Sequence, residues 1–154
     1  MIREARFLDI PRLGAVMEEM HGRSRYAAYG LDLEGFKNQC VQAIEGHGQG
    51  TCLFVADGEQ KAEGFILGVT DAPYGVIEAR YATDLFFYVT LGADPHHASR
   101  LYDAFLAWAQ AAPGVIEIRN GAVDAISDYR RTERLYQRKG LTQEGVLYRM
   151  ETNQ

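Results

Sequence analysis

The apolar positions of this chain change several times between helical and strand spacing. A weak period-two alternation over residues 3–8 indicates a strand. Residues 10–20 carry apolar side chains at intervals of three and four, which predicts an amphipathic helix that begins after the N-cap Asp9. A loop over residues 21–30 separates this helix from a second one, which is predicted to begin after Asp32.

The middle of the chain has the pattern of a sheet. Residues 51–56 and 63–70 both have strand character, and the Asp-Gly pair between them favours a hairpin turn. Residues 76–90 also look extended. The run 85–89 is apolar at every position, which is typical of a strand that is covered on both faces, so we expect it in the middle of the sheet.

The last third of the chain predicts further alternation of helix and strand. A helix is expected over residues 95–111, a short strand over 115–119, the last long helix over 127–139 and a closing strand over 146–150. No repeat or linker interrupts this order, which therefore predicts one mixed α/β domain over residues 1–154.

Composition and charge narrow the function classes. The 154 residues are 47% hydrophobic and 24% charged, enough for one real core. A net charge of -5 argues against general nucleic-acid binding. No stretch approaches the roughly 20 apolar residues of a membrane span, and the N-terminus lacks the apolar run of a secretory signal. We therefore expect a cytoplasmic protein with no membrane or nucleic-acid partner.

Two cysteines are present, Cys40 in a helical pattern and Cys52 in a strand pattern. They form neither a CxxC pair nor a disulfide framework, which favours buried free thiols over redox chemistry. The adjacent pair His96-His97 is a poor metal signature without further ligands, so no metal is expected.

Two local sequences carry a family resemblance. The first is Asp84-Leu85-Phe86-Phe87-Tyr88-Val89, followed by a turn over residues 90–98 and a helix over residues 99–110. The second is Arg134-Leu135-Tyr136-Gln137-Arg138-Lys139-Gly140-Leu141, a helix end followed by a glycine stop. With the order of elements, they resemble the GNAT superfamily of acyl-CoA-dependent N-acyltransferases from residue 2 to about residue 150.

The resemblance implies a central, mostly antiparallel twisted sheet of six to seven strands, flanked by about four helices. It implies acetyl-CoA as cosubstrate, with the coenzyme A pyrophosphate bound by backbone amides at the start of the helix after the turn. The residues that it places near the cofactor in this turn are Val89, Thr90, Gly92, His96, His97, Ala98, Ser99 and Arg100.

This turn departs from the superfamily pattern of Arg or Gln, two residues, Gly, one residue, then Gly or Ala. Those places hold Ala93, His96 and Ala98, of which only the last fits. His96, His97 and Arg100 are available as replacement donors to an anion. The loosened turn is similar to that of a divergent subgroup found in bacteriophage genomes.

Tyr136 occupies the place where superfamily members commonly carry the tyrosine that protonates the leaving thiolate of coenzyme A. A phenol with a pKa near 10 suits this task, which a phenylalanine cannot perform. Without the resemblance, packing on the helix face that Tyr136 shares with Tyr129 is the favoured interpretation.

The attacking amine must lose a proton, so a base is expected beside the apolar strand. Asp84 is the first candidate, and Glu78 is the second. Period-two alternation puts Asp84 on the face opposite Leu85, Phe87 and Val89. For both carboxylates, an exposed charge at the start of a strand is the competing interpretation.

Two further residues complete the predicted site. Asn120 follows the predicted strand 115–119, where many relatives place a polar residue near the pantetheine arm, and Arg130 on the last helix is a candidate phosphate ligand. An arginine-rich helix face that is simply solvated is the alternative for Arg130. The backbone of Val89 and Thr90 is expected to bind the pantetheine amides.

Together these features predict an N-acetyltransferase that moves acetyl from acetyl-CoA to a primary amine by direct attack, on a small-molecule or protein acceptor. A noncatalytic acyl-CoA-binding or protein-interaction module with the same fold is the alternative. A homodimer through an edge strand or the final hairpin is compatible with the sequence.

Overall fold

The computed structural model describes residues 1–152, so the last two residues of the predicted domain lie outside the described part. The elements in chain order are β1 (Ile2–Glu4), the 3₁₀ helix η1 (Phe7–Asp9), α1 (Ile10–Arg23), α2 (Leu33–Glu45), β2 (Thr51–Asp57), β3 (Ala62–Asp71), the 3₁₀ helix η2 (Pro73–Gly75), β4 (Arg80–Val89), α3 (His97–Ala111), β5 (Val115–Ile118) and α4 (Arg130–Arg138).

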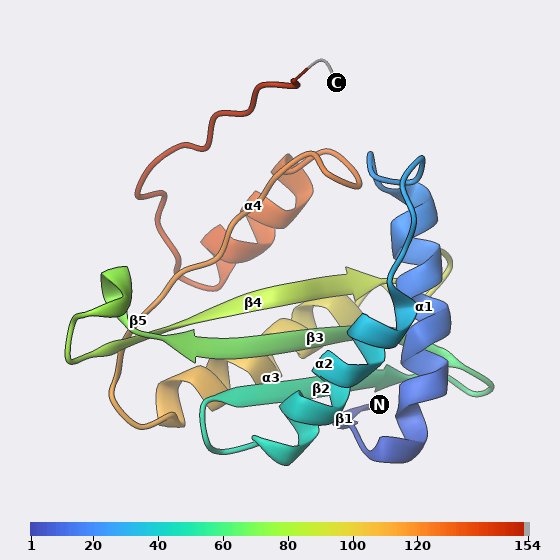
Figure 1. Cartoon of the computed structure of the whole chain (residues 1–154), viewed down its shortest axis with the longest axis horizontal. Coiled ribbons are helices and arrows are strands. Elements are labelled where there is room, and N and C mark those ends of the chain that lie inside the picture. Colours follow the sequence, from blue (N-terminus) through green and yellow to red (C-terminus); the bar gives the residue numbers. More distant parts are fainter. Residues whose placement is uncertain (153–154) are drawn as a thin grey trace.

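The strands form one sheet in the order β1-β2-β3-β4-β5. The pairs β1–β2, β2–β3 and β3–β4 are antiparallel, and β4–β5 is parallel. Helices α1 and α2 cover one face of the sheet, and α3 lies behind the other face (Figure 1). The predicted mixed α/β fold with a mostly antiparallel sheet and four α-helices is confirmed. The strand in the middle is β3, however, because β4 lies beside the edge strand.

The prediction of six to seven strands is wrong, because the described residues form a sheet of five. The predicted closing strand 146–150 is absent from the described chain, and its apolar side chains are 67–88% exposed (Val146, Leu147, Tyr148 and Met150). The segment after α4 runs away from the sheet (Figure 1). Period-two alternation is a local signal, whereas a strand also needs a neighbour for its backbone groups.

The ends of three other elements differ from the prediction. The strand predicted over residues 3–8 stops at Glu4, because the Asp9 carboxylate accepts a hydrogen bond of 2.8 Å from the Arg6 backbone and the chain turns into η1. Helix α1 continues to Arg23 rather than residue 20. Strand β4 begins only at Arg80, after η2 and a bend.

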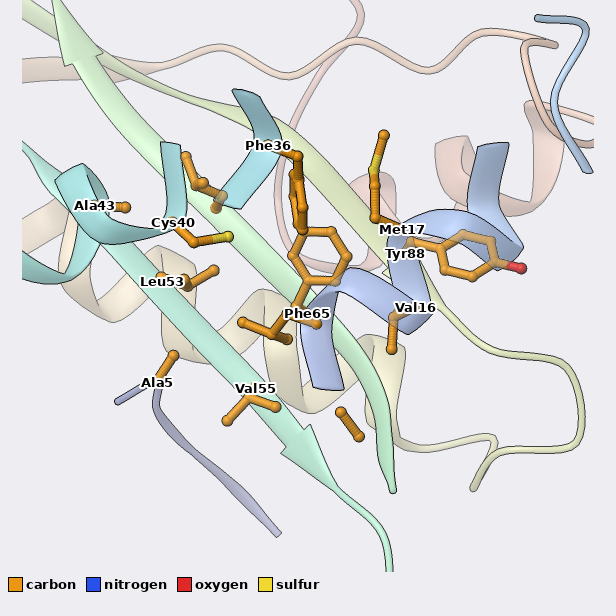
Figure 2. Packing of buried hydrophobic residues seen from close by; sticks show 13 residues of the cluster. Ala5, Val16, Met17, Phe36, Cys40, Ala43, Leu53, Val55, Phe65 and Tyr88 are labelled. Carbon is orange, nitrogen blue, oxygen red and sulfur yellow. The ribbon is translucent and has the colours of Figure 1, made fainter. Parts of the chain in front are cut away.

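Apolar side chains form a cluster on each face of the sheet. On the α1–α2 face, Phe36 of α2 packs against Phe65 of β3 with ring centroids 5.5 Å apart (Figure 2). On the α3 face, Phe105 packs against Trp108 and Tyr102. Both clusters reach β4, through Phe86 and Tyr88 on one face and through Phe87 and Val89 on the other, but Leu85 of the predicted fully covered run is 53% exposed.

Both cysteines are buried free thiols, as predicted, one in each apolar cluster. Burial raises the pKa of Cys40 and of Cys52 to about 12. Thiols with such pKa values are inert at neutral pH. None of the helices within residues 1–152 combines the length and apolarity needed to cross a bilayer.

Candidate active site

Strands β4 and β5 separate after a short paired stretch. Their pairing covers Arg80, Tyr81 and Ala82 of β4 only. Beyond Ala82, within residues 1–152, this edge of β4 has no strand partner. The gap exposes backbone groups of β4 beside the segment that follows β5. We call this gap the β4–β5 split.

A β-bulge lies in β4 at the mouth of the split. Leu67 of β3 pairs with Phe86 and Gly68 pairs with Asp84, so Leu85 is the extra residue of β4. Because of this extra residue, the alternation of side chains between the two faces of the sheet shifts by one position at Leu85. Asp84 therefore contacts groups on the α3 face, where Phe87 also packs, and the predicted opposite placement of these two side chains is wrong.

A chain of hydrogen bonds joins Asp84 to α3. The Asn120 side-chain amide donates to the Asp84 carboxylate, and the Tyr102 hydroxyl donates to the Asn120 amide oxygen at 2.7 Å. Burial raises the pKa of Asp84, while the bond from Asn120 opposes this shift. The carboxylate forms no ion pair with the described part of the chain, so the Asn120 amide is its main stabilising contact.

Tyr136 comes from α4 and packs against this chain. Its ring centroid is 4.9 Å from that of Tyr102, and its hydroxyl points at the Gly121 carbonyl oxygen, 3.4 Å away. Tyr136 is buried, which raises its pKa far above the ordinary value, and the nearby Asp84 charge adds to the shift. At neutral pH the phenol is therefore protonated and can act as a donor.

Two cavities meet at the segment after β5. The smaller, of about 280 Å³, is lined by Met20, Asp84, Leu85, Phe86, Phe87, Gly121, Val123 and Ile126. The larger, of about 1440 Å³, lies between β5, α4 and the C-terminal segment, and its lining includes Asn120, Gly121, Val123 and Tyr136. Gly121 and Val123 belong to both cavities. The carboxylate and the phenol thus face two adjoining spaces.

The predicted phosphate turn leads into α3 as expected. Gly92 has φ of 77°, a conformation that suits glycine, and α3 starts at His97. The N–H groups of the next two residues, Ala98 and Ser99, lie in the first helical turn, where no intrahelical acceptor exists. The Asp94 carboxylate accepts the His96 N–H at 2.8 Å, which holds the pKa of Asp94 below its usual range.

Some predicted side chains of this turn are committed to protein contacts. His97 is buried with its Nδ1 3.0 Å from a Glu63 carboxylate oxygen, and the Thr90 hydroxyl donates to the Glu63 carbonyl oxygen at 3.2 Å. His96 and Arg100 are exposed, with Arg100 4.0 Å from Asp94. Residues 89–100 line neither of the two cavities.

Two other candidates lie away from the split. Glu78 is exposed in the bend before β4, six positions before Asp84 along the chain, and lines neither cavity. Arg130 is exposed at the start of α4 and contacts Asp128 at 3.4 Å. Of the predicted residues, Asp84, Asn120 and Tyr136 are therefore the three that meet at the β4–β5 split.

Sequence reasoning missed Tyr102, Leu85 and Gly121. Tyr102 follows Leu101 on the amphipathic helix α3, and this position predicts only a packing role in the core for its ring. Its partner Asn120 is 18 residues away, so no local pattern joins them.

Around His96-His97, the described residues contain no group of three His, Cys, Asp or Glu side chains placed to hold a metal ion.

No protein-family model and no curated protein sequence matches the chain. Several solved structures are similar to it in fold. A probable acetyltransferase superposes with a TM-score of 0.72 at 12% identity, covering 100% of this chain and 99% of that chain. AAC(6')-Iy in complex with a bisubstrate analogue, CoA-S-monomethyl-acetylneamine, gives 0.71 at 14% identity, covering 99% and 98%.

A third structure is the ribosomal-protein-alanine N-acetyltransferase from Brucella melitensis biovar Abortus 2308, with a TM-score of 0.66 at 13% identity. It covers 99% of this chain and 99% of that chain. At such low identity the likeness concerns the backbone, and it extends over nearly the whole length of each partner. The chain has the fold of the GNAT acetyltransferases.

Proposed function

We propose that this protein transfers an acetyl group from acetyl-CoA to a primary amine. The observation that carries the proposal is the meeting of Tyr136 and Asp84 at the β4–β5 split, one facing each of two adjoining cavities. A protonated phenol and a carboxylate are the acid and the base that direct acyl transfer requires. The similar structure with a bisubstrate analogue of coenzyme A supports the choice of cosubstrate.

Tyr136 is the proposed acid. The amine nitrogen attacks the thioester carbonyl carbon, the carbon–sulfur bond breaks, and the thiolate takes up a proton from the Tyr136 hydroxyl. The phenol is protonated at neutral pH, and burial raises its pKa further, so the proton is present when the sulfur becomes negative. The resulting phenolate regains a proton from solvent. The present acceptor of its hydrogen bond, the Gly121 carbonyl at 3.4 Å, is distant enough to be replaced by a better one.

Asp84 is the proposed base. A free primary amine has a pKa of about 10.4, so it must lose a proton before or during attack. Asp84 lines the smaller cavity, and burial raises its pKa, which makes it a stronger base near neutrality. The apolar side chains of Met20, Phe86 and Ile126 line the same cavity.

The bulge at Leu85 supports the same location for the chemistry. A bulged residue leaves a backbone group outside the ladder of strand hydrogen bonds. A backbone N–H at this position would stabilise the oxyanion that forms when the amine attacks the carbonyl. Leu85 lines the smaller cavity next to Asp84, so the oxyanion donor and the base belong to one space.

For the cofactor, the residues at the start of α3 fit a pyrophosphate. The free N–H groups of Ala98 and Ser99 and the positive end of the helix dipole attract an anion. The exposed His96 and Arg100 side chains add donors to the same helix start. The unpaired edge of β4 from the bulge to Val89 is the proposed partner of the pantetheine amides.

Two assays test the function. The melting temperature is measured with coenzyme A at millimolar concentration, and free thiol release is measured with acetyl-CoA and a panel of primary amines. We expect a rise in melting temperature and amine-dependent thiol release. A missing thermal shift contradicts acyl-CoA binding altogether. A shift without thiol release from any amine favours the noncatalytic binding module.

A further inference from the structure

Asn120 has both ends of its side-chain amide engaged. Its nitrogen donates to the Asp84 carboxylate, and its oxygen accepts the Tyr102 hydroxyl at 2.7 Å. The three side chains come from β4, from the segment after β5 and from α3, and so bridge the β4–β5 split where the two strands diverge. Both hydrogen bonds of the Asn120 amide are to protein side chains, which indicates that Asn120 positions groups of the site.

We propose that Tyr102 and Asn120 are positioning residues that hold the Asp84 carboxylate ionised and in one orientation at the mouth of the β4–β5 split. The inference rests on the proposed function for its catalytic meaning, because Asp84 is the base there. The structural part, a relay of hydrogen bonds from a phenol through an amide to a carboxylate, stands on the contacts alone.

The Tyr102 ring is fixed by aromatic neighbours on several sides. Its centroid lies 5.8 Å from that of Phe87, 5.6 Å from that of Phe105 and 4.9 Å from that of Tyr136. The side chain is completely buried. An ionised carboxylate only accepts hydrogen bonds, so the Asn120 nitrogen faces Asp84 and its oxygen is left to accept from the Tyr102 hydroxyl, whose position the packed ring fixes.

Each hydrogen bond of the relay is donated in the same direction, from Tyr102 to Asn120 and from Asn120 to Asp84. The Tyr102 hydroxyl withdraws electron density from the amide oxygen of Asn120, which makes the amide N–H a better donor to the carboxylate. A donor to the charged form of a carboxyl group favours that form. The relay therefore opposes the effect of burial, which favours the neutral acid.

The other groups around Asp84 do not replace this support. Gly68 of β3 is its partner across the sheet, and Met20 of α1 lines the same cavity, so neither brings a charge. The titratable groups that sense its charge are the phenols of Tyr102 and Tyr136, whose pKa values it raises. Only Asn120 among these neighbours donates a hydrogen bond to the carboxylate.

The experiment is a titration of the Asp84 carboxyl carbon by NMR in the whole protein, in wild type and in Tyr102→Phe. This substitution removes the hydroxyl and keeps the ring. We expect the pKa of Asp84 to rise by about 0.5 to 1 unit in Tyr102→Phe and by more in Asn120→Leu. Tyr88→Phe, which removes a nearly buried hydroxyl from the opposite face, is the matched control and should leave this pKa unchanged.

An unchanged or lower Asp84 pKa in Tyr102→Phe overturns the proposal, because a merely packing ring predicts that result. In the active enzyme, the acidic limb of kcat/KM against pH should move upward by the same amount, with KM for acetyl-CoA within about twofold. If wild type acetylates no amine, the proposed function fails, while the NMR titration still decides on the relay.

Discussion

At the scale of single residues, Tyr136 joins two properties that sequence reasoning treats as alternatives. It packs in the core cluster of the α3 face, as an amphipathic helix predicts, and its hydroxyl reaches the segment that lines both cavities. The packing raises its pKa, and the phenol is protonated at neutral pH, as a free phenol also is.

Tyr136→Phe tests that role. We expect turnover to fall by about 10- to 1000-fold, with acetyl-CoA affinity within a few-fold of wild type, because only the transition state uses the proton. Steady-state kinetics and calorimetric binding give the two quantities. Tyr74→Phe is the control, since the Tyr74 side chain is exposed in the turn before β4. Unchanged turnover in Tyr136→Phe would remove the residue from the mechanism.

Asp9 carries a separate prediction about stability. Arg3 makes two contacts of 2.8 Å to its carboxylate, the Arg6 N–H makes a third, and the pKa falls from 3.8 to about 2. A depressed folded-state pKa adds stability that is complete above the unfolded value and is lost as the pH falls through the folded value. Asp9→Asn should therefore cost about 2 kcal/mol at neutral pH.

Urea unfolding as a function of pH measures this effect. Wild type should lose the contribution between about pH 4 and pH 2, and Asp9→Asn should lack that part of the pH dependence. Asp103→Asn, whose carboxylate is 56% exposed beside Lys139, should change stability by less than about 1 kcal/mol. Equal pH profiles for wild type and Asp9→Asn would contradict the assignment.

At the scale of elements, the sequence predicted helices and strands better than their ends. Helix α2 begins after its predicted cap, where the Asp32 carboxylate accepts the Gly35 N–H at 2.8 Å. The β2–β3 hairpin also forms as predicted. The bulge at Leu85 was not predictable, because it depends on the register with β3, and it decides which side chains share a face with Asp84.

The contact between β3 and α3 gives a prediction at this scale. A Cβ added at Gly68 would lie 2.8 Å from both the Cys52 sulfur and the Phe105 ring. Because both neighbours are fully buried, Gly68→Ala should destabilise the protein by about 1–3 kcal/mol in chemical unfolding. Gly22→Ala in α1 meets nothing within 4 Å and should be neutral or stabilising. Equal stability of the two variants would show that the sheet moves away from α3 at little cost.

At the scale of the whole molecule, the order of elements was enough to predict a GNAT-like fold, and the similar solved structures support it. The same order could not show that the segment after α4 leaves the sheet, since its alternation is that of a strand. The split between β4 and β5 is also a property of the assembled sheet. It brings Asp84, Asn120 and Tyr136 together from three parts of the chain.

The central claim is that acetyl-CoA occupies this split with its sulfur at Tyr136. A crystal structure with coenzyme A bound tests it most directly. We predict the pyrophosphate at the N–H groups of Ala98 and Ser99, the pantetheine along the free edge of β4, and the sulfur within hydrogen-bonding distance of the Tyr136 hydroxyl. Coenzyme A bound elsewhere, or in the split with its sulfur turned away from Tyr136, would contradict the account.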